Sequence, residues 1–371
     1  MKRRTENVLM AFAFCAVSGG LIAFNAYAVP NIATLTQTKP NVSQSFASSA
    51  PQEKPEISFA SSKVPVLNAA EKVPVSTVED ELERTMTAEE MQQIYNYLDN
   101  NTSRREFPTT NREMSDQEIN RSKVLEDRYE YDGVRPQNKL PLKSGVSSFY
   151  FDMSQDTWIY PDRELTDEEL LQYIDWYSRV NFALSKRYSS PQPDAKDIRE
   201  EEALSNARES VSKLFDTDVS KMKVSTAFHT FGPEQKGEWL VHFQPYRART
   251  LDANGSAYMM YVVMIDALSG TVSDTTIINT AYKKTPITSE MNKQIRQEPS
   301  WVEAAKNVVL KKQGETRAIQ KSTFIQDQVY DKRGVVAIAI ELTDGSKYTV
   351  ELRYPEKTLR CLIYKPAASG K

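Results

Sequence analysis

A repeated order of elements in the C-terminal half limits the possible fold more than any other feature of this sequence. One helix pattern followed by four strand patterns occurs twice, and the two occurrences begin 103 residues apart, at Asp197 and Ser300. Repetition of a whole unit of this kind predicts an internal duplication. Because an amphipathic helix must bury its apolar side, each helix should pack on its own antiparallel sheet, which is an α+β arrangement.

The first unit is expected over residues 197–280. Its helix should begin with a capping box, in which the side chains of Asp197 and Glu200 satisfy free backbone N–H groups. Four strands should follow, at residues 222–231, 238–246, 257–266 and 271–278. Asn254-Gly255 marks one of the turns, and Asn-Gly is a strong hairpin signal.

The second unit is expected over residues 298–366, where Ser300 and Glu303 form the same capping pattern. Its strands are predicted at residues 318–326, 335–342, 347–353 and 358–364. The predicted fold is therefore α+β, with tandem units of one helix packed on a four-stranded antiparallel sheet.

A known family shares these patterns. In residues 261–272, Y-V-V-M-I-D-A-L-S-G-T-V, a strand ends at Asp266 and Gly270 leads into the next strand. With the helix at 200–215, this run resembles PepSY domains, small extracytoplasmic modules also found in the pro-regions of thermolysin-like metallopeptidases. The second unit resembles them more loosely, and the resemblance covers residues 197–365. It implies a non-catalytic module that binds or restrains a partner such as a peptidase.

Asp266 and Gly270 can be interpreted without a ligand. An Asp at the start of a turn accepts backbone N–H groups, and a Gly supplies a positive φ. We therefore predict turn residues here.

Residues 1–28 have the three parts of a signal peptide. Lys2, Arg3 and Arg4 form a basic head, residues 8–24 are apolar or small, and Ala26-Tyr27-Ala28 is a small-residue exit. We expect cleavage after Ala28. The alternative is an uncleaved anchor, although about 17 residues is the lower limit for spanning a membrane. Either way, the protein is expected outside the cytoplasm, secreted or associated with the cell envelope, and its membrane contact is limited to residues 1–28 if they are uncleaved.

Residues 29–80 are rich in Pro, Ser, Thr, Ala and Lys and show no sustained period. Such a segment buries too little apolar surface to fold, so we predict a disordered linker. At about 50 residues, its average reach is near 40 Å.

Residues 81–147 are predicted to be helical and partly disordered, and residues 148–285 to hold a middle helix and then the first repeated unit. The middle helix is expected at residues 167–187, where apolar residues recur at helical spacing. Three helices in these regions should begin with capping boxes, at Thr87 with Glu90, Ser115 with Glu118, and Thr166 with Glu169.

Charge and cysteine content exclude several classes of protein. Without residues 1–28, which hold Lys2, Arg3, Arg4 and Glu6, the chain has 44 basic and 49 acidic residues. This mild acidity argues against nucleic acid and against anionic membrane surfaces. Cys361 is then the single cysteine, so stability must come from a hydrophobic core, and its strand position predicts a buried, unreactive thiol.

The two histidines, His229 and His242, are predicted on the sheet face that points away from the helix. If the hairpin turns through residues 232–237, His229 lies opposite Leu240 and His242 opposite Ala227, which places the imidazoles about 7 to 8 Å apart. Such a pair would form a proton-sensitive or weak metal site. The alternative is coincidence, which we favour because no third ligand is visible at metal spacing. We predict no metal and no cofactor.

Aromatic residues are dense between residues 149 and 177 and include Trp158, Trp176 and Tyr177. They are candidates for the lining of a binding groove, and the alternative is an ordinary hydrophobic core.

The sequence lacks the common motifs for nucleophilic, zinc-dependent or nucleotide-dependent catalysis. We therefore predict an exported, non-enzymatic protein that binds a protein or peptide partner, such as a peptidase, at the cell envelope. The alternatives are an envelope hydrolase with an unrecognised site in residues 148–285 and a structural spacer.

Overall fold

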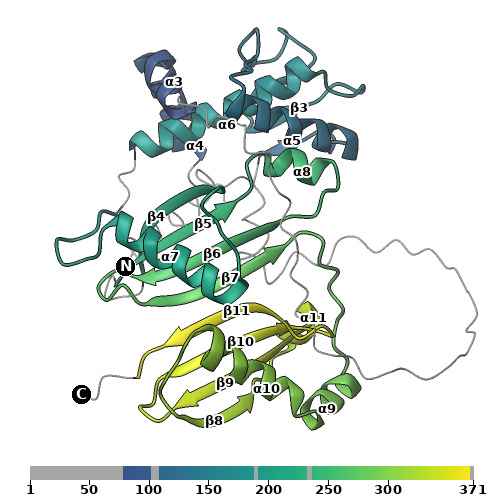
Figure 1. Ribbon diagram of the computed structural model, residues 1–371. Coiled ribbons are helices and arrows are strands. Elements are labelled where there is room, and N and C mark those ends of the chain that lie inside the picture. Colours follow the sequence, from purple (N-terminus) through teal and green to yellow (C-terminus); the bar gives the residue numbers. More distant parts are fainter. Residues whose placement is uncertain (1–77, 102–107, 188–190, 232–235, 368–371) are drawn as a thin grey trace, which may run out of the picture. The chain divides into compact units, whose positions relative to one another are not determined.

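The computed structural model describes residues 78–101, 108–187, 191–231 and 236–367. The predicted signal peptide and residues 29–77 of the predicted linker lie outside these ranges. Within them, no helix is both long enough and apolar enough to cross a membrane. The described chain is α+β, with a large eight-stranded antiparallel sheet and a small three-stranded sheet (Figure 1).

The large sheet has the strand order β4-β5-β6-β7-β11-β10-β9-β8. Every strand lies within two residues of its predicted bounds, because alternating or continuous apolar residues mark each strand and turn residues mark its ends. The strands are β4 (Lys223–Phe231), β5 (Lys236–Gln244), β6 (Met259–Asp266), β7 (Val272–Asn279), β8 (Ile319–Phe324), β9 (Val335–Leu342), β10 (Lys347–Arg353) and β11 (Thr358–Lys365).

The two halves of the large sheet, β4–β7 and β8–β11, meet at a seam between β7 and β11. The sequence predicted a separate sheet for each half, whereas the structure pairs Thr276 with Cys361 and Thr275 with Leu362 across this seam. An unpaired strand edge exposes backbone N–H and C=O groups, so pairing two edges satisfies both. Among the described residues, β4 and β8 are then the outer strands.

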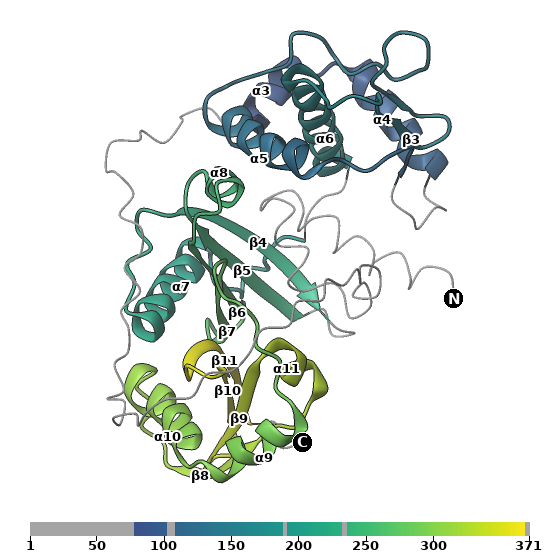
Figure 2. The same ribbon diagram turned by 90° about the vertical axis from the view of Figure 1, so that its right-hand side faces the viewer.

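Helices α7 (Glu200–Phe215) and α10 (Ser300–Asn307) pack on the same side of the large sheet (Figure 2). α7 contacts β5, β6 and β7, whereas α10 contacts β9 and β10. Leu214 of α7 packs into the apolar cluster around α10, so the core continues across the seam. We call this side of the sheet the helix face and the other side the opposite face.

The capping boxes predicted for α7 and α10 are both wrong. α7 begins after Arg199, and Asp197 instead accepts the backbone N–H of Asp194. α10 includes Ser300 as its first residue, and the Ser300 hydroxyl donates to Glu298. In both cases the side chain that was expected to cap the helix is hydrogen-bonded within the preceding turn instead. After α10 the chain continues as a π-helical turn, η1 (Val308–Lys312).

A helical region precedes the large sheet. Its helices are α3 (Val78–Thr85), α4 (Ala88–Asn101), α5 (Asp116–Tyr131) and α6 (Asp167–Arg187), and its small sheet consists of β1 (Thr109–Thr110), β2 (Tyr150–Asp152) and β3 (Thr157–Ile159). The three capping boxes predicted here are confirmed, with hydrogen bonds of 2.7–3.2 Å in both directions.

Two of these caps carry an additional arginine three residues earlier. Arg112 donates to both carboxylate oxygens of Glu118, at 2.7 and 2.9 Å. Arg163 binds Glu169 in the same way, at 2.7 Å for both bonds. Glu118 is fully buried and also accepts the backbone N–H of Leu165, so one carboxylate ties the start of α5 to the chain that leads into α6.

The predicted linker extends too far, because α3 begins at Val78, inside its last three residues. Neither α3 nor three further short helices were predicted: α8 (Ala248–Ala253), α9 (Ser289–Gln297) and α11 (Gln328–Arg333). α8 connects β5 to β6 and packs on α5. α9 and α11 have side-chain caps, Thr288 and Asp327, which are signals that the sequence contained.

Candidate functional site

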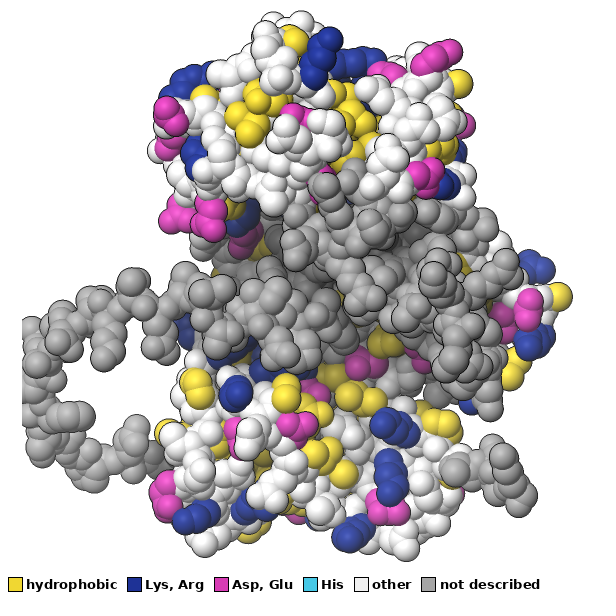
Figure 3. All heavy atoms as spheres, turned by 180° about the vertical axis from the view of Figure 1, so that it is seen from behind, with side chains coloured by type: hydrophobic (Ala, Val, Ile, Leu, Met, Phe, Trp, Pro, Cys, Tyr) yellow, Lys and Arg dark blue, Asp and Glu magenta, His cyan; other side chains and the backbone are white. Residues whose placement is uncertain are grey.

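The opposite face of the large sheet carries small and polar side chains. Over β8–β11, the strand register places Thr323, Ala339, Thr349 and Ile363 in one row across the sheet. Thr323 is exposed and the other three are partly exposed. Figure 3 shows the molecule from behind, where charged and apolar side chains lie close together over this half of the sheet. Small side chains in a row leave a flat surface that another chain can approach closely.

Next to this row, a buried polar cluster lies at the seam. The Thr276 hydroxyl is 2.8 Å from Asp274 Oδ1 and 3.0 Å from Cys361 Sγ, and the thiol lies 3.5 Å from both Asp274 carboxylate oxygens. Cys361 is 2% exposed, which confirms that it is buried. Burial raises the pKa of the Cys361 thiol, and the Asp274 carboxylate raises it further. The cluster therefore holds a protonated thiol, which is a poor nucleophile.

A second polar group lies opposite Cys361 on β10. Glu351 is 4% exposed and pairs with the Arg360 guanidinium. Burial raises the pKa of Tyr330, from α11, to about 12, and the nearby Glu351 carboxylate adds to this shift. These charges are satisfied within the protein, so they stabilise the seam end of the opposite face.

The predicted pairing of the histidines is wrong. His229 lies opposite Glu238 and His242 opposite Ser225, a register two residues away from the predicted one. His229 is only 9% exposed. Burial lowers the pKa of His242 to about 4, and His229 lowers it further. Burial also lowers the pKa of His229, so both imidazoles are neutral at neutral pH. No cluster of three or more metal-binding side chains occurs in the described ranges.

Gly237 explains the shifted register. We predicted that the turn includes this glycine, but β5 already begins at Lys236. The Phe228 ring of β4 packs directly over Gly237, where a Cβ atom would come within 2.6 Å of the ring. Glycine within a strand often marks such a close approach. Because hairpin register follows turn length, the shorter turn moves every pair along the hairpin.

The turn predicted at Asp266 is confirmed. The Asp266 carboxylate accepts the backbone N–H of Ser269 at 2.8 Å, and Gly270 has a φ of +70°. These interactions account for both residues without a ligand.

The aromatic residues form a core. Trp158 and Trp176 are 2% and 7% exposed, and both belong to the main apolar cluster of the helical region. Tyr177 packs against the Trp158 ring with a centroid distance of 5.9 Å. The observed packing favours a hydrophobic core over a binding groove at these three residues.

The helical region contacts α8, the helix that connects β5 to β6, through largely buried ion pairs between α5 and α8. Arg249 Nε lies 2.8 Å from Glu126, and Arg249 Nη1 lies 2.7 Å from Glu130 and 3.6 Å from Asp127. The backbone N–H of Thr250 donates to Asp127 at 2.6 Å. Burial raises the pKa of Glu126 and of Asp127, because their charged forms lose water. Sequence analysis missed this group because α8 was not predicted.

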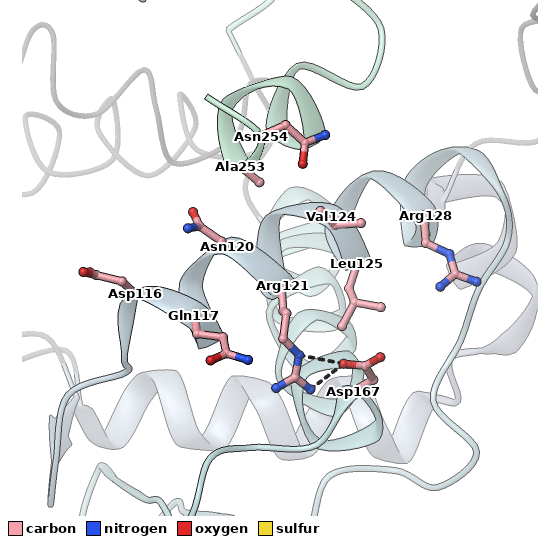
Figure 4. A pocket seen from close by; sticks show the side chains of 10 residues that line it. All are labelled: Asp116, Gln117, Asn120, Arg121, Val124, Leu125, Arg128, Asp167, Ala253 and Asn254. Atoms are coloured by element: carbon pink, nitrogen blue, oxygen red, sulfur yellow. Dashed lines mark hydrogen bonds and ion pairs between the residues drawn. The ribbon is translucent and has the colours of Figure 1, made fainter. Parts of the chain in front are cut away.

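A cleft of about 590 Å³ lies beside this contact, between α5, the start of α6 and the end of α8 (Figure 4). Its lining includes Asn120, Arg128 and Asn254. Arg121 on its wall is already paired with Asp167 at 2.5 Å. The polar lining does not converge on one point, so we assign no ligand to this cleft.

No known protein family matches the chain, and neither curated proteins nor solved structures show significant similarity to it. Function must therefore be inferred from the residues and their arrangement.

Proposed function

We propose that the protein is an exported, non-enzymatic binding protein of the cell envelope, and that the opposite face of its large sheet receives a protein or peptide partner. One observation carries this proposal. α7 and α10 cover the helix face, whereas Thr323 and Lys347 remain exposed on the opposite face. Away from the seam, where Cys361 and Glu351 are buried, the opposite face over β8–β11 therefore offers a preformed surface to a partner. The signal-peptide pattern in residues 1–28 supports export.

We also propose that the two halves of the large sheet are tandem PepSY-like units. Each half is a four-stranded meander with consecutive strands paired, and each contacts one main helix. The likeness of residues 261–272 to the PepSY pattern supports this interpretation. A peptidase is therefore our preferred partner.

The test is capture and reconstitution. The tagged chain is incubated with envelope extract, retained proteins are identified, and the strongest candidate is purified for a direct binding titration. We expect one specific partner, and inhibition of its activity if it is a peptidase. A Thr323→Tyr/Thr349→Tyr variant should lose this binding, because the two bulky side chains obstruct the opposite face. Tyrosine is favourable in strands, so the variant should still fold.

The matched control is Ser205→Tyr/Ser212→Tyr, which places the same side chains on exposed positions of α7. This variant should bind as well as the unmodified chain. The proposal fails if no purified candidate binds, or if both variants bind equally well.

A further inference from the structure

One row of the opposite face concentrates positive charge. The strand register aligns Lys321 of β8 with Glu341 of β9, Glu341 with Lys347 of β10, and Lys347 with Lys365 of β11. Directly opposed residues of antiparallel strands point to the same face, so all four side chains lie together. Ile338 and Ile340 alternate with these positions and belong to the core on the helix face, which assigns the row to the opposite face.

The charges in this row are not balanced. Glu341 lies 3.5 Å from Lys347, and this is the one ion pair within the row. Lys321 and Lys365 are exposed and have no ion-pair partner among the described residues. Three lysines thus share one carboxylate, in a chain whose net charge is −3. Local charge of this sign attracts an anionic partner.

The pair Lys347 and Lys365 is unfavourable in the free protein. Like charges directly opposite each other destabilise a sheet, whereas opposite charges or Thr pairs stabilise it. A fold selected for stability alone would not place two lysines here. A bound carboxylate between them would convert this repulsion into attraction.

The neighbouring row indicates the kind of anion. Thr323, Ala339, Thr349 and Ile363 lie one row along the sheet and are small or apolar. Strands lie about 4.8 Å apart, so the lysine row spans about 14 Å across four strands. This length suits carboxylates repeated along one side of an extended or helical segment, with apolar side chains on the adjacent row. A phosphate polymer or a lipid headgroup would use the lysines but not the apolar row.

We propose that Lys321, Lys347 and Lys365 form a docking row for an acidic, amphipathic segment of a protein partner. This proposal rests on the proposed binding function of the opposite face and specifies the chemistry of the partner. The row and the neighbouring apolar residues act together, the lysines by charge and Ile363 and Ala339 by contact.

The test uses the full chain and a labelled synthetic peptide of repeating Glu-Leu, measured by fluorescence anisotropy. We expect salt-sensitive binding that weakens at least about tenfold in a Lys347→Ser/Lys365→Ser variant. The matched control, Lys283→Ser/Lys284→Ser, removes the same charge from exposed positions before α9 and should change affinity less than about twofold. The variant removes the repulsion between Lys347 and Lys365 and also the exposed ion pair of Lys347 with Glu341, so its melting temperature should stay close to that of the unmodified chain.

Polyphosphate and phosphatidylglycerol vesicles are tested in parallel. The proposal is overturned if the peptide does not bind, if both variants bind it equally, or if polyphosphate or the vesicles bind at least as tightly in a lysine-dependent way. A lower melting temperature of the double variant would assign the lysines a structural role. In that case the peptide-binding measurement is repeated with the single variant Lys365→Thr, because threonine is favourable in strands. Failure here together with successful partner capture would leave the proposed function intact.

Discussion

Glu118 shows how much structure one carboxylate can organise. It is fully buried, binds Arg112 through both oxygens, and accepts the backbone N–H groups of Ser115 and Leu165 at 2.7 and 2.6 Å. It therefore caps α5 and holds the chain that enters α6. Sequence analysis found the cap but not the arginine, although Arg112 and Arg163 occupy the same position ahead of Ser115 and Thr166.

We predict that Glu118→Gln lowers the free energy of unfolding by about 2 kcal/mol, measured by urea denaturation at neutral pH. The loss is smaller than for a fully enclosed ion pair because the Arg112 side chain is 25% exposed. Arg112 lowers the pKa of Glu118 from 4.5 to about 2. The folded pKa is below the unfolded one, so this stabilisation is present above about pH 4.5 and is lost as the pH falls toward 2. The difference between variant and parent should shrink over this range.

The control is Glu303→Gln on α10. Glu303 is 62% exposed and pairs with Lys306 one turn away, so its loss should cost less than about 0.5 kcal/mol. Equal losses for the two variants, or a difference that does not change with pH, would contradict the role of Glu118.

Among the elements, those defined by local patterns were predictable from sequence. Strand β9 was predicted at its observed bounds, because residues 335–340 form a continuous apolar run and glycine precedes them. The histidine register was not predictable, because it depends on the contact between Phe228 and Gly237, nine residues apart. The seam between β7 and β11 also joins distant residues, and no local pattern encodes it. The lysine row depends on both strand register and sheet order, so sequence analysis could not assemble it.

The contact between α5 and α8 leads to a prediction at this scale. Arg249→Ala removes the counter-charge of Glu126 and Asp127, whereas Glu130 keeps its ion pair with Lys223. We expect the free energy of unfolding to fall by about 3 kcal/mol, because breaking a largely buried ion group leaves the Glu126 and Asp127 carboxylates without a counter-charge. In the variant, the rate of amide hydrogen exchange should increase more in α5 and α8 than in β9 or β10.

Arg247→Ala is the matched control, since it removes an arginine from the start of the same helix. Arg247 pairs with Asp132, and the two side chains are 31% and 38% exposed. A pair this exposed contributes less than about 1 kcal/mol. If Arg247→Ala destabilises the protein as much as Arg249→Ala, the buried group is not what holds α5 to α8.

For the large sheet as a whole, the seam determines whether its two halves act as one body. The β7 and β11 backbones pair directly, and Lys312 of η1 donates to the carbonyl oxygen of Leu214 in α7 at 2.8 Å. Leu214 also packs into the cluster around α10. Backbone, polar and apolar contacts therefore all cross from one half to the other. A rigid seam would fix the lysine row relative to the rest of the opposite face.

We therefore predict that the two halves unfold together. Leu352→Ala removes a fully buried side chain from β10 and should cost about 2 to 5 kcal/mol. In native-state hydrogen exchange, the slowest amides of β5 and β6 should lose as much protection as those of β9 and β10, because one cooperative unit shares its stability. Leu310→Ala, the same change at a 42% exposed position of η1, should leave both sets nearly unchanged. Loss of protection confined to β8–β11 would show that the halves unfold independently. The lysine row would then belong to a unit that moves separately from the first half of the sheet.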